Sequence, residues 1–429
     1  MQLRPTLLTA ALAFAAGALP LTARTLVYAG TLIDGVSPDV KKEMTIVVDG
    51  DRITAIQPGY TAAASGDTVI DLKGATVTPG WIDCHVHLDY VQSANSYSER
   101  FAMNPGDYAL RGAFNAKKTL RAGFTTVRNL GDAENSTLAL RKAIAAGWVE
   151  GPRIYTAGKT IATTGGHADA TNGVSQKLMG DPGPLEGVIN GADEARKAVR
   201  QHYKDGVDVI KITATGGVLD LSTNAQNAQF TPEEMHAIVD TAHEYGLKVA
   251  AHAHGTVGMK RAVEAGVDSI EHGTFMTDEV VALMKQHGTY YVPTLSAGRW
   301  VMEKAKVPGY LPAVVIPKVM LIGPAMTGTF QRAYQAGVKI AFGTDQGVAP
   351  HGENALEFVY MVDAGMSPMR AIQSATLEAA RLLGVEQNLG TVEAGKYADL
   401  VAVPGDLLAN IKLVSQVSFV MKGGIVYKP

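Results

Sequence analysis

Trp81-Ile82-Asp83-Cys84-His85-Val86-His87 is an apolar run that ends in two histidines two positions apart. Side chains alternate along a β-strand, so His85 and His87 should leave the end of this predicted strand on the same side. Imidazole is the commonest metal ligand near neutral pH. Taken alone, the spacing also fits a surface pair that binds no metal, so the rest of the chain has to decide.

The run belongs to a recurring unit of a helical stretch, a glycine and a short, β-branched apolar segment. Six segments follow this pattern: Gly123–Val127, Gly206–Ile212, Gly246–Ala251, Gly266–Ile270, Gly288–Val292 and Gly337–Phe342. A glycine just past a helix end adopts the left-handed cap, and the apolar run is typical of a buried parallel strand. With Arg153–Gly158 and the histidine strand there are eight candidates, which predict an α/β fold with a (β/α)8 barrel. The chemistry of such a barrel lies at the carboxyl ends of its strands.

The two ends of the chain have a different pattern. Residues 24–80 and 388–429 contain short β runs separated by hairpin signals such as Asp49-Gly50 and Gly423-Gly424. Chain termini often lie close together, so we expect both ends to form one small β-sheet or sandwich domain. The prediction is therefore a small domain from 24–80 and 388–429 and a catalytic barrel over 81–387.

The composition excludes some classes of partner. The chain has 429 residues, of which 46% are hydrophobic and 18% charged, with a formal net charge of −3. This is an ordinary globular composition without the basic excess of a nucleic-acid-binding protein. The single cysteine, Cys84, allows no internal disulfide, and we expect it to be a buried structural thiol.

Residues 1–23 have the pattern of an export signal. Arg4 gives a positive start, Leu7–Leu21 an apolar stretch, and Leu21-Thr22-Ala23 a small-residue cleavage site. The alternative is a buried helix or a membrane anchor, which the short length and Pro20 argue against. The prediction is a periplasmic or secreted protein that has no membrane association once the signal is removed.

Polar residues gather where the predicted strands end. They are His85, His87, Lys211, His252, His254, His272 and Asp345. Each alone has a simpler explanation: a histidine satisfied in the core, a lysine reaching solvent, or an aspartate capping a turn. Together they would leave unpaired polar groups in an apolar barrel mouth, at a cost of about 1–3 kcal/mol each. The pattern therefore predicts a metal centre.

This arrangement resembles the amidohydrolase superfamily, specifically its binuclear members. The resemblance rests on residues 79–87, on Lys211, on His252 and His272, on Gly343-Thr344-Asp345, and on Ala394–Leu400. It implies two divalent metal ions, usually zinc. In that scheme His85, His87 and Asp345 bind one ion, His252 and His272 bind the other, and an N6-carboxylated Lys211 bridges them. Burial would lower the lysine pKa and leave a neutral amine free to react with CO2.

The resemblance also implies a mechanism. Two metal ions lower the pKa of a bridging water and polarise the scissile carbonyl. Asp345 would take the proton of that water and return it to the leaving nitrogen. His254, which shares a face with His252, would bind the oxyanion or a substrate carboxylate.

The substrate contacts are less strongly indicated. His167 lies in a loop with Gly165-Gly166 that could approach a ligand, so we expect it to polarise the substrate oxygen, with a structural role in the loop as the alternative. Arg128 could bind a carboxylate, or else form a salt bridge to Asp132 or another rim acid. His351 follows the eighth strand and is a further candidate for substrate contact. The remaining histidines fall in helical stretches and should be solvated: His202, His236, His243 and His287.

Within the superfamily, the chain looks most similar to the branch of Xaa-Pro dipeptidases and carboxypeptidase-like amidohydrolases, which includes bacterial enzymes that hydrolyse ochratoxin A. This implies hydrolysis of the amide bond in N-acyl or N-aminoacyl L-amino acids with a free carboxylate, and release of phenylalanine from ochratoxin A. The alternative is a cyclic amidohydrolase or deaminase of the imidazolonepropionase type, against which Lys211 argues. A scaffold without catalysis or a metal-sequestering protein fits poorly with a full ligand set. Members of this branch often form homo-oligomers, and Lys304–Pro312 could be a lid or a subunit contact.

Overall fold

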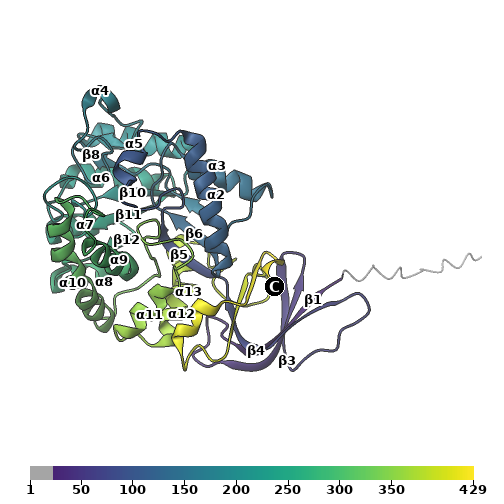
Figure 1. Cartoon of the computed structure of the whole chain (residues 1–429). Coiled ribbons are helices and arrows are strands. Elements are labelled where there is room, and N and C mark those ends of the chain that lie inside the picture. The colour runs from purple at the N-terminus through teal and green to yellow at the C-terminus, as the bar shows by residue number, and fades with distance from the viewer. Residues whose placement is uncertain (1–22) are drawn as a thin grey trace, which may run out of the picture.

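The computed structural model describes residues 23–429 (Figure 1). Residues 1–22, and with them all but the last residue of the predicted export signal, lie outside the described part of the chain. Within the described part, no helix has the length and apolar character needed to cross a membrane.

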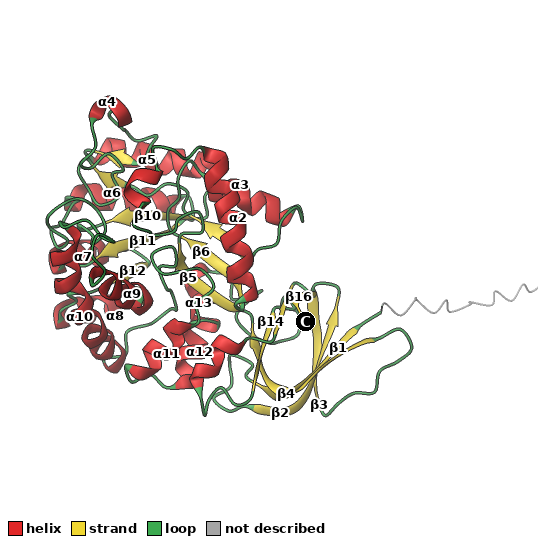
Figure 2. Ribbon diagram, in the orientation of Figure 1, coloured by secondary structure: helices red, strands yellow, loops and turns green. Residues whose placement is uncertain are grey.

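Parallel strands run through the larger part of the molecule and are surrounded by helices (Figure 2). Seven of the eight predicted barrel strands are present: β5 (Trp81–Val86), β6 (Phe124–Asn129), β7 (Arg153–Thr156), β10 (Val209–Thr213), β11 (Lys248–Ala253), β12 (Ser269–His272) and β13 (Tyr290–Val292). The six glycines predicted to cap the preceding helices all have positive φ, between 71° at Gly246 and 102° at Gly123. The sequence pattern therefore located these strands correctly.

The strand ladders do not join into one closed ring. β5–β6–β7 form a three-stranded sheet and β10–β11–β12–β13 a four-stranded one. Between them Asp208 N donates to Thr156 O at 2.8 Å. The predicted eighth strand is not assigned as a strand: it makes an isolated bridge from Ile340 to Tyr291, and Phe342 O accepts from Cys84 N at 2.9 Å. The α/β architecture is as predicted. The strands do not form the fully closed eight-stranded barrel that the sequence predicted.

Helices connect and cover these strands. They are α2 (Pro105–Arg121), α3 (Ser136–Ala145), α5 (Ala192–Asp205), α6 (Pro232–Glu244), α7 (Thr256–Glu264), α8 (Asp278–His287), α9 (Leu295–Ala305), α10 (Val315–Gln335), α11 (Leu356–Asp363), α12 (Pro368–Ser374) and α13 (Leu377–Leu383). Shorter elements are α1 (Ser96–Glu99), α4 (Gln176–Met179), η1 (Ile411–Gln416), β8 (Ala162–Thr163) and β9 (Val188–Ile189). The predicted insertion Lys304–Pro312 lies at the connection between α9 and α10, which pack against each other.

Both ends of the chain meet in one seven-stranded sheet, which lies to one side of the helical body in Figure 1. Its strand order is β16 (Ile425–Lys428), β15 (Phe419–Lys422), β14 (Leu400–Pro404), β4 (Thr68–Pro79), β1 (Thr25–Leu32), β2 (Lys41–Asp49) and β3 (Arg52–Pro58). The pairing of the two ends is as predicted, with β4 antiparallel to β14.

This sheet is joined directly to the histidine strand. β4 ends at Pro79 and β5 begins at Trp81, with only Gly80 between them. Gly80 N donates to Asp399 O at 2.8 Å, and a Cβ on Gly80 would lie 2.2 Å from Thr125 Oγ1. Only glycine allows this close approach. The small sheet therefore anchors the base of the strand that presents His85 and His87.

Candidate metal centre and active site

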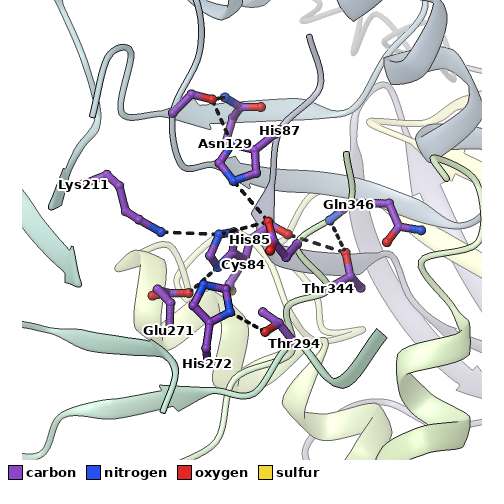
Figure 3. Close-up of polar contacts among 12 residues, drawn as sticks. Cys84, His85, His87, Asn129, Lys211, Glu271, His272, Thr294, Thr344 and Gln346 are labelled. Carbon is purple, nitrogen blue, oxygen red and sulfur yellow. Dashed lines mark hydrogen bonds and ion pairs between the residues drawn. The ribbon is translucent and has the colours of Figure 1, made fainter. Parts of the chain in front are cut away.

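His85 in β5, His87 just after it, and Asp345 lie together (Figure 3 labels both histidines). Asp345 Oδ1 is 3.2 Å from His87 Nε2 and 3.5 Å from His85 Nε2. One ligand atom from each of the three lies within 4.8 Å of the others. Two imidazoles and a carboxylate at this spacing are a donor set that suits zinc and leaves coordination positions open.

Lys211 on β10 points at the same place. Lys211 is 4% exposed, and its Nζ lies 3.4 Å from His85 Nε2. Burial lowers the pKa of Lys211 to about 8. A substantial neutral fraction is therefore present near neutral pH, which is the form that can react with CO2.

The histidines of β11 and β12 complete the cluster. The His272 ring centre is 4.7 Å from that of His252, 5.0 Å from that of His254 and 5.1 Å from that of His85. Burial, and then the proximity of the other cationic groups, holds the pKa of His252 and of His272 well below the ordinary value. Neutral imidazole is the form that binds a metal.

Hydrogen bonds hold four of these rings through Nδ1. The partners are Glu271 Oε2 for His85 (2.9 Å), Gly131 O for His87 (3.1 Å), Thr294 Oγ1 for His272 (2.7 Å) and Thr274 Oγ1 for His254 (2.8 Å). Each ring is then left with Nε2 for a ligand. Ring orientation through the distal nitrogen is the usual support of a metal-binding histidine.

His252 is oriented the opposite way. Its Nε2 lies 3.1 Å from Gly216 O, which leaves Nδ1 as the nitrogen without a hydrogen-bond partner among the described residues. The predicted set His85, His87, Lys211, His252, His272 and Asp345 thus converges with one free donor nitrogen on each histidine. The donor set of His85, His87 and Asp345 fits a divalent cation, and the other predicted ligands lie beside it.

The backbone is strained at two of the predicted ligands. Asp345 and His272 have φ values of 58° and 69°, and Thr294, which bonds His272, has 51°. Non-glycine residues rarely adopt this conformation, and it clusters at functional sites. A buried carboxylate holds the neighbouring chain: Asp83 accepts from Thr344 Oγ1 at 2.6 Å and from the His85 backbone at 3.1 Å. Burial raises the pKa of Asp83 to about 6.

The cluster opens into a cavity of about 480 Å³. The predicted ligands, with His167 and His254, form one part of its lining. An apolar wall from α9 and α10 forms another part, through Ala297, Val301, Val319, Ile322 and Met326. A cavity of this size and lining accommodates a small molecule with an apolar side chain.

His167 enters this cavity from the glycine-containing loop, as predicted. Its Nδ1 lies 2.5 Å from Asp220 Oδ2, and its ring stacks on His252 with 4.4 Å between centres. His254 also lines the cavity, and burial lowers its pKa to about 3. Both residues are placed to contact a bound substrate.

The prediction that Arg128 binds the substrate is wrong. Arg128 is 2% exposed and does not line the cavity. Its guanidinium donates to Cys84 O at 2.6 Å, Ser269 Oγ at 3.0 Å and Glu271 Oε1 at 2.8 Å. All its bonds lie inside the barrel beneath the ligands. The alternative of a structural ion pair is the correct one, although the acid is Glu271 rather than Asp132.

His351 does not have its predicted position in contact with the substrate cavity. It is buried, its Nε2 bonds Tyr90 O at 3.1 Å, and it is not among the residues that line the cavity. It supports the chain behind the site. His202, predicted to be solvated, is instead buried between Ala198 O and Lys159 O. His236, His243 and His287 are exposed as expected, and Cys84 is a buried free thiol, also as expected.

The sequence interpretation missed the residues that hold the ligands. Glu271, Thr294 and Asp220 were not singled out, although each bonds a site histidine. One signal was available, because Glu271 directly follows Gly266–Ile270, a segment predicted to be a buried strand. A buried carboxylate of this kind requires a cationic or hydrogen-bonding partner.

Comparison with known proteins adds to this geometry. The family model described as "Amidohydrolase family" matches residues 76–426. The ochratoxinase of Aspergillus niger is 32% identical over 435 residues, covering 94% of this chain and 86% of that protein. A crystal structure of a Xaa-Pro dipeptidase with bound methionine in the active site superposes with a TM-score of 0.92 at 50% identity, covering 95% of this chain and all of that one. The imidazolonepropionase of Erwinia tasmaniensis is 28% identical over 385 residues, covering 84% of this chain and 86% of that protein.

Proposed function

This chain belongs to the amidohydrolase family and is a hydrolase of amide bonds, and we propose that its substrates are N-acyl or N-aminoacyl L-amino acids with a free carboxylate. The observation that carries the proposal is the cavity, which is lined both by a cluster of histidines and by an apolar wall. The names of two relatives point the same way, since one is called a Xaa-Pro dipeptidase and the other an ochratoxinase. Ochratoxin A is then a substrate that shares the required shape.

The chain's own groups divide the work. His85, His87 and Asp345 would hold one divalent cation, His252 and His272 a second, and N6-carboxylated Lys211 would join them, with zinc as the expected metal. When bound, the pair supplies a water of lowered pKa and polarises the scissile carbonyl. Asp345 is the carboxylate at the centre, where it can take a proton from the attacking water and deliver it to the leaving nitrogen.

Two histidines remain for the substrate. His167 and His254 line the cavity, and each has its Nδ1 engaged, by Asp220 and Thr274 respectively. Their Nε2 atoms are therefore the groups that face a ligand. We assign His167 to the substrate carbonyl oxygen and His254 to the oxyanion or the carboxylate.

Arg100 replaces Arg128 as the proposed guanidinium for the substrate carboxylate. It lines the cavity, where Arg128 does not. Its Nη1 donates to Ala170 O at 2.7 Å, and its Nε is buried without a hydrogen-bond partner among the described residues. The forked donors of a guanidinium match a carboxylate.

The alternative is hydrolysis of a cyclic amide or a deamination, as in the imidazolonepropionase relative. That relative is less similar to this chain than the dipeptidase structure, at 28% against 50% identity. Lys211, buried beside His85, fits a two-metal centre better than a single-metal one.

The test is a substrate panel on zinc-loaded protein with a chelator-treated control. It contains Xaa-Pro dipeptides, N-acetyl amino acids, ochratoxin A, the C-terminal amide of each amino-acid substrate, and 4-imidazolone-5-propionate. The proposal predicts chelator-sensitive release of free amino acid, with the amidated versions much slower. Turnover of the imidazolone alone would replace the proposal with its alternative.

A further inference from the structure

Asp220 joins His167 to a lysine that belongs to α10. Asp220 Oδ2 lies 2.5 Å from His167 Nδ1, while its Oδ1 lies 2.9 Å from Lys318 Nζ. The side chains of Asp220 and Lys318 are 5% and 4% exposed. The three residues are far apart in the sequence, and His167 and Asp220 line the cavity.

The Lys318 ammonium has all three of its donors engaged within this loop. Besides Asp220 Oδ1 it contacts Gly217 O at 3.0 Å and Asp220 O at 2.8 Å. An ammonium has three donors, so none is left for another group. Lys318 therefore fixes the backbone of the loop after β10 as well as the Asp220 carboxylate.

Three groups fix the His167 ring in its turn. Asp220 bonds Nδ1, His252 stacks against one face, and Gly217 lies so close that a Cβ there would be 2.1 Å from Cε1. Nε2 has no hydrogen-bond partner among the described residues, and the ring lines the cavity. The ring is held with Nε2 as its available nitrogen.

We infer that Asp220 and Lys318 are positioning residues, which act on the reaction through His167. The inference rests on the proposed function, in which His167 contacts the substrate carbonyl oxygen. A ring free to rotate would lose this contact, and small misplacements of a catalytic group are costly in rate. Without Lys318, the buried Asp220 carboxylate would lose its cationic partner and the loop its link to α10.

The arrangement also connects two parts of the cavity. α10 carries Lys318 and also the apolar wall residues Val319, Ile322 and Met326. The same helix that faces the substrate side chain thus holds the carboxylate that orients His167. α10 is in this way part of the active site rather than only its cover.

The first experiment is a mutant cycle on the best substrate of the panel. Asp220→Asn and Lys318→Met should each lower kcat by roughly 10- to 100-fold while KM changes by no more than about 2-fold. In a His167→Gln background the same changes should have almost no further effect, because non-additivity identifies residues that act as a unit. The matched control is Lys260→Met, which removes an exposed pair with Glu279 (2.5 Å) and should leave kcat unchanged.

Zinc content and thermal unfolding of each variant show whether it has folded. If Lys318→Met fails to fold, Lys318→Arg keeps the charge and should retain most of kcat. Equal losses in the wild-type and His167→Gln backgrounds would overturn the inference, since they would show a structural role that does not pass through His167.

A second measurement does not depend on activity. ¹⁵N-histidine NMR should show the His167 Nδ1 proton bonded in the zinc-loaded wild-type protein and lost in Asp220→Ala, with the other site histidines unchanged. If the wild-type protein hydrolyses nothing in the panel but shows this signal, the proposed function has failed while the positioning of His167 stands. Absence of any change at His167 in Asp220→Ala would overturn the positioning itself.

Discussion

Glu271 Oε2 lies 2.9 Å from His85 Nδ1, at a depth where the Glu271 side chain has no exposed surface. Burial alone would raise the pKa of Glu271, but the opposing charge of Arg128 and the bond to His85 lower it to about 2. The carboxylate is therefore ionised at neutral pH. An anion at the distal nitrogen orients a metal-binding histidine and strengthens it as a donor.

Removal of the Arg128 charge, which pairs with Glu271, should weaken both the fold and the metal centre. Arg128→Met would leave Glu271 as a buried, unpaired anion, at a cost of about 3–5 kcal/mol in unfolding free energy. It should also reduce zinc affinity by about 10- to 100-fold through His85. Denaturant titration and competition with a zinc indicator measure the two effects.

The control for that change is Arg121→Met, which breaks an exposed pair with Glu150. Exposed ion pairs contribute at most about 1 kcal/mol to the free energy of unfolding. This pair does not contact the predicted metal ligands. If both variants lose the same stability and bind zinc equally well, the buried pair does not support the centre.

Assembly of the centre should depend on pH through Lys211. Its pKa is lowered to about 8. The fraction of neutral amine, the form that reacts with CO2, therefore increases as the pH rises through 8 and decreases as the pH falls below 8. Apoprotein given zinc and the same concentration of dissolved CO2 at each pH should therefore regain activity faster at pH 8.5 than at pH 6.5. Activity assays on samples taken at intervals follow the recovery, and the Lys211→Met variant should not regain activity at either pH. Equal rates at both pH values would argue against carboxylation of this lysine.

The close contact at Gly217 gives a separate test of the His167 geometry. Gly217→Ala places a Cβ 2.1 Å from the His167 ring, which must move, and kcat should fall by roughly 10- to 100-fold. Gly328→Ala in α10 meets nothing within 4 Å and should keep full activity. A Gly217→Ala variant with unchanged kcat would show that the ring position is not critical.

The sequence predicted the parts of the site that depend on local rules. Alternation along β5 places His85 and His87 on one side, and the glycine caps fix where the following strands begin. Because parallel strands end at one rim, Lys211 and Asp345 could be expected beside them. These predictions need no knowledge of packing.

The errors concern residues whose role is decided by depth and by distant partners. Arg128 lies near the end of β6, but its buried position depends on Glu271, which is 143 residues away. Asp220 and Lys318 are 98 residues apart. Position at a strand end does not distinguish a side chain in the cavity from one in the barrel interior, and only the assembled fold pairs such charges.

The measurement that tests the central claim most directly is the release of the C-terminal amino acid from the best panel substrate, before chelation, after removal of metal, and after zinc is returned. The account predicts that activity disappears with the metal, returns when two zinc ions are bound per chain, and is absent in zinc-loaded Asp345→Asn. Undiminished release by the metal-free protein, or by Asp345→Asn, would contradict it.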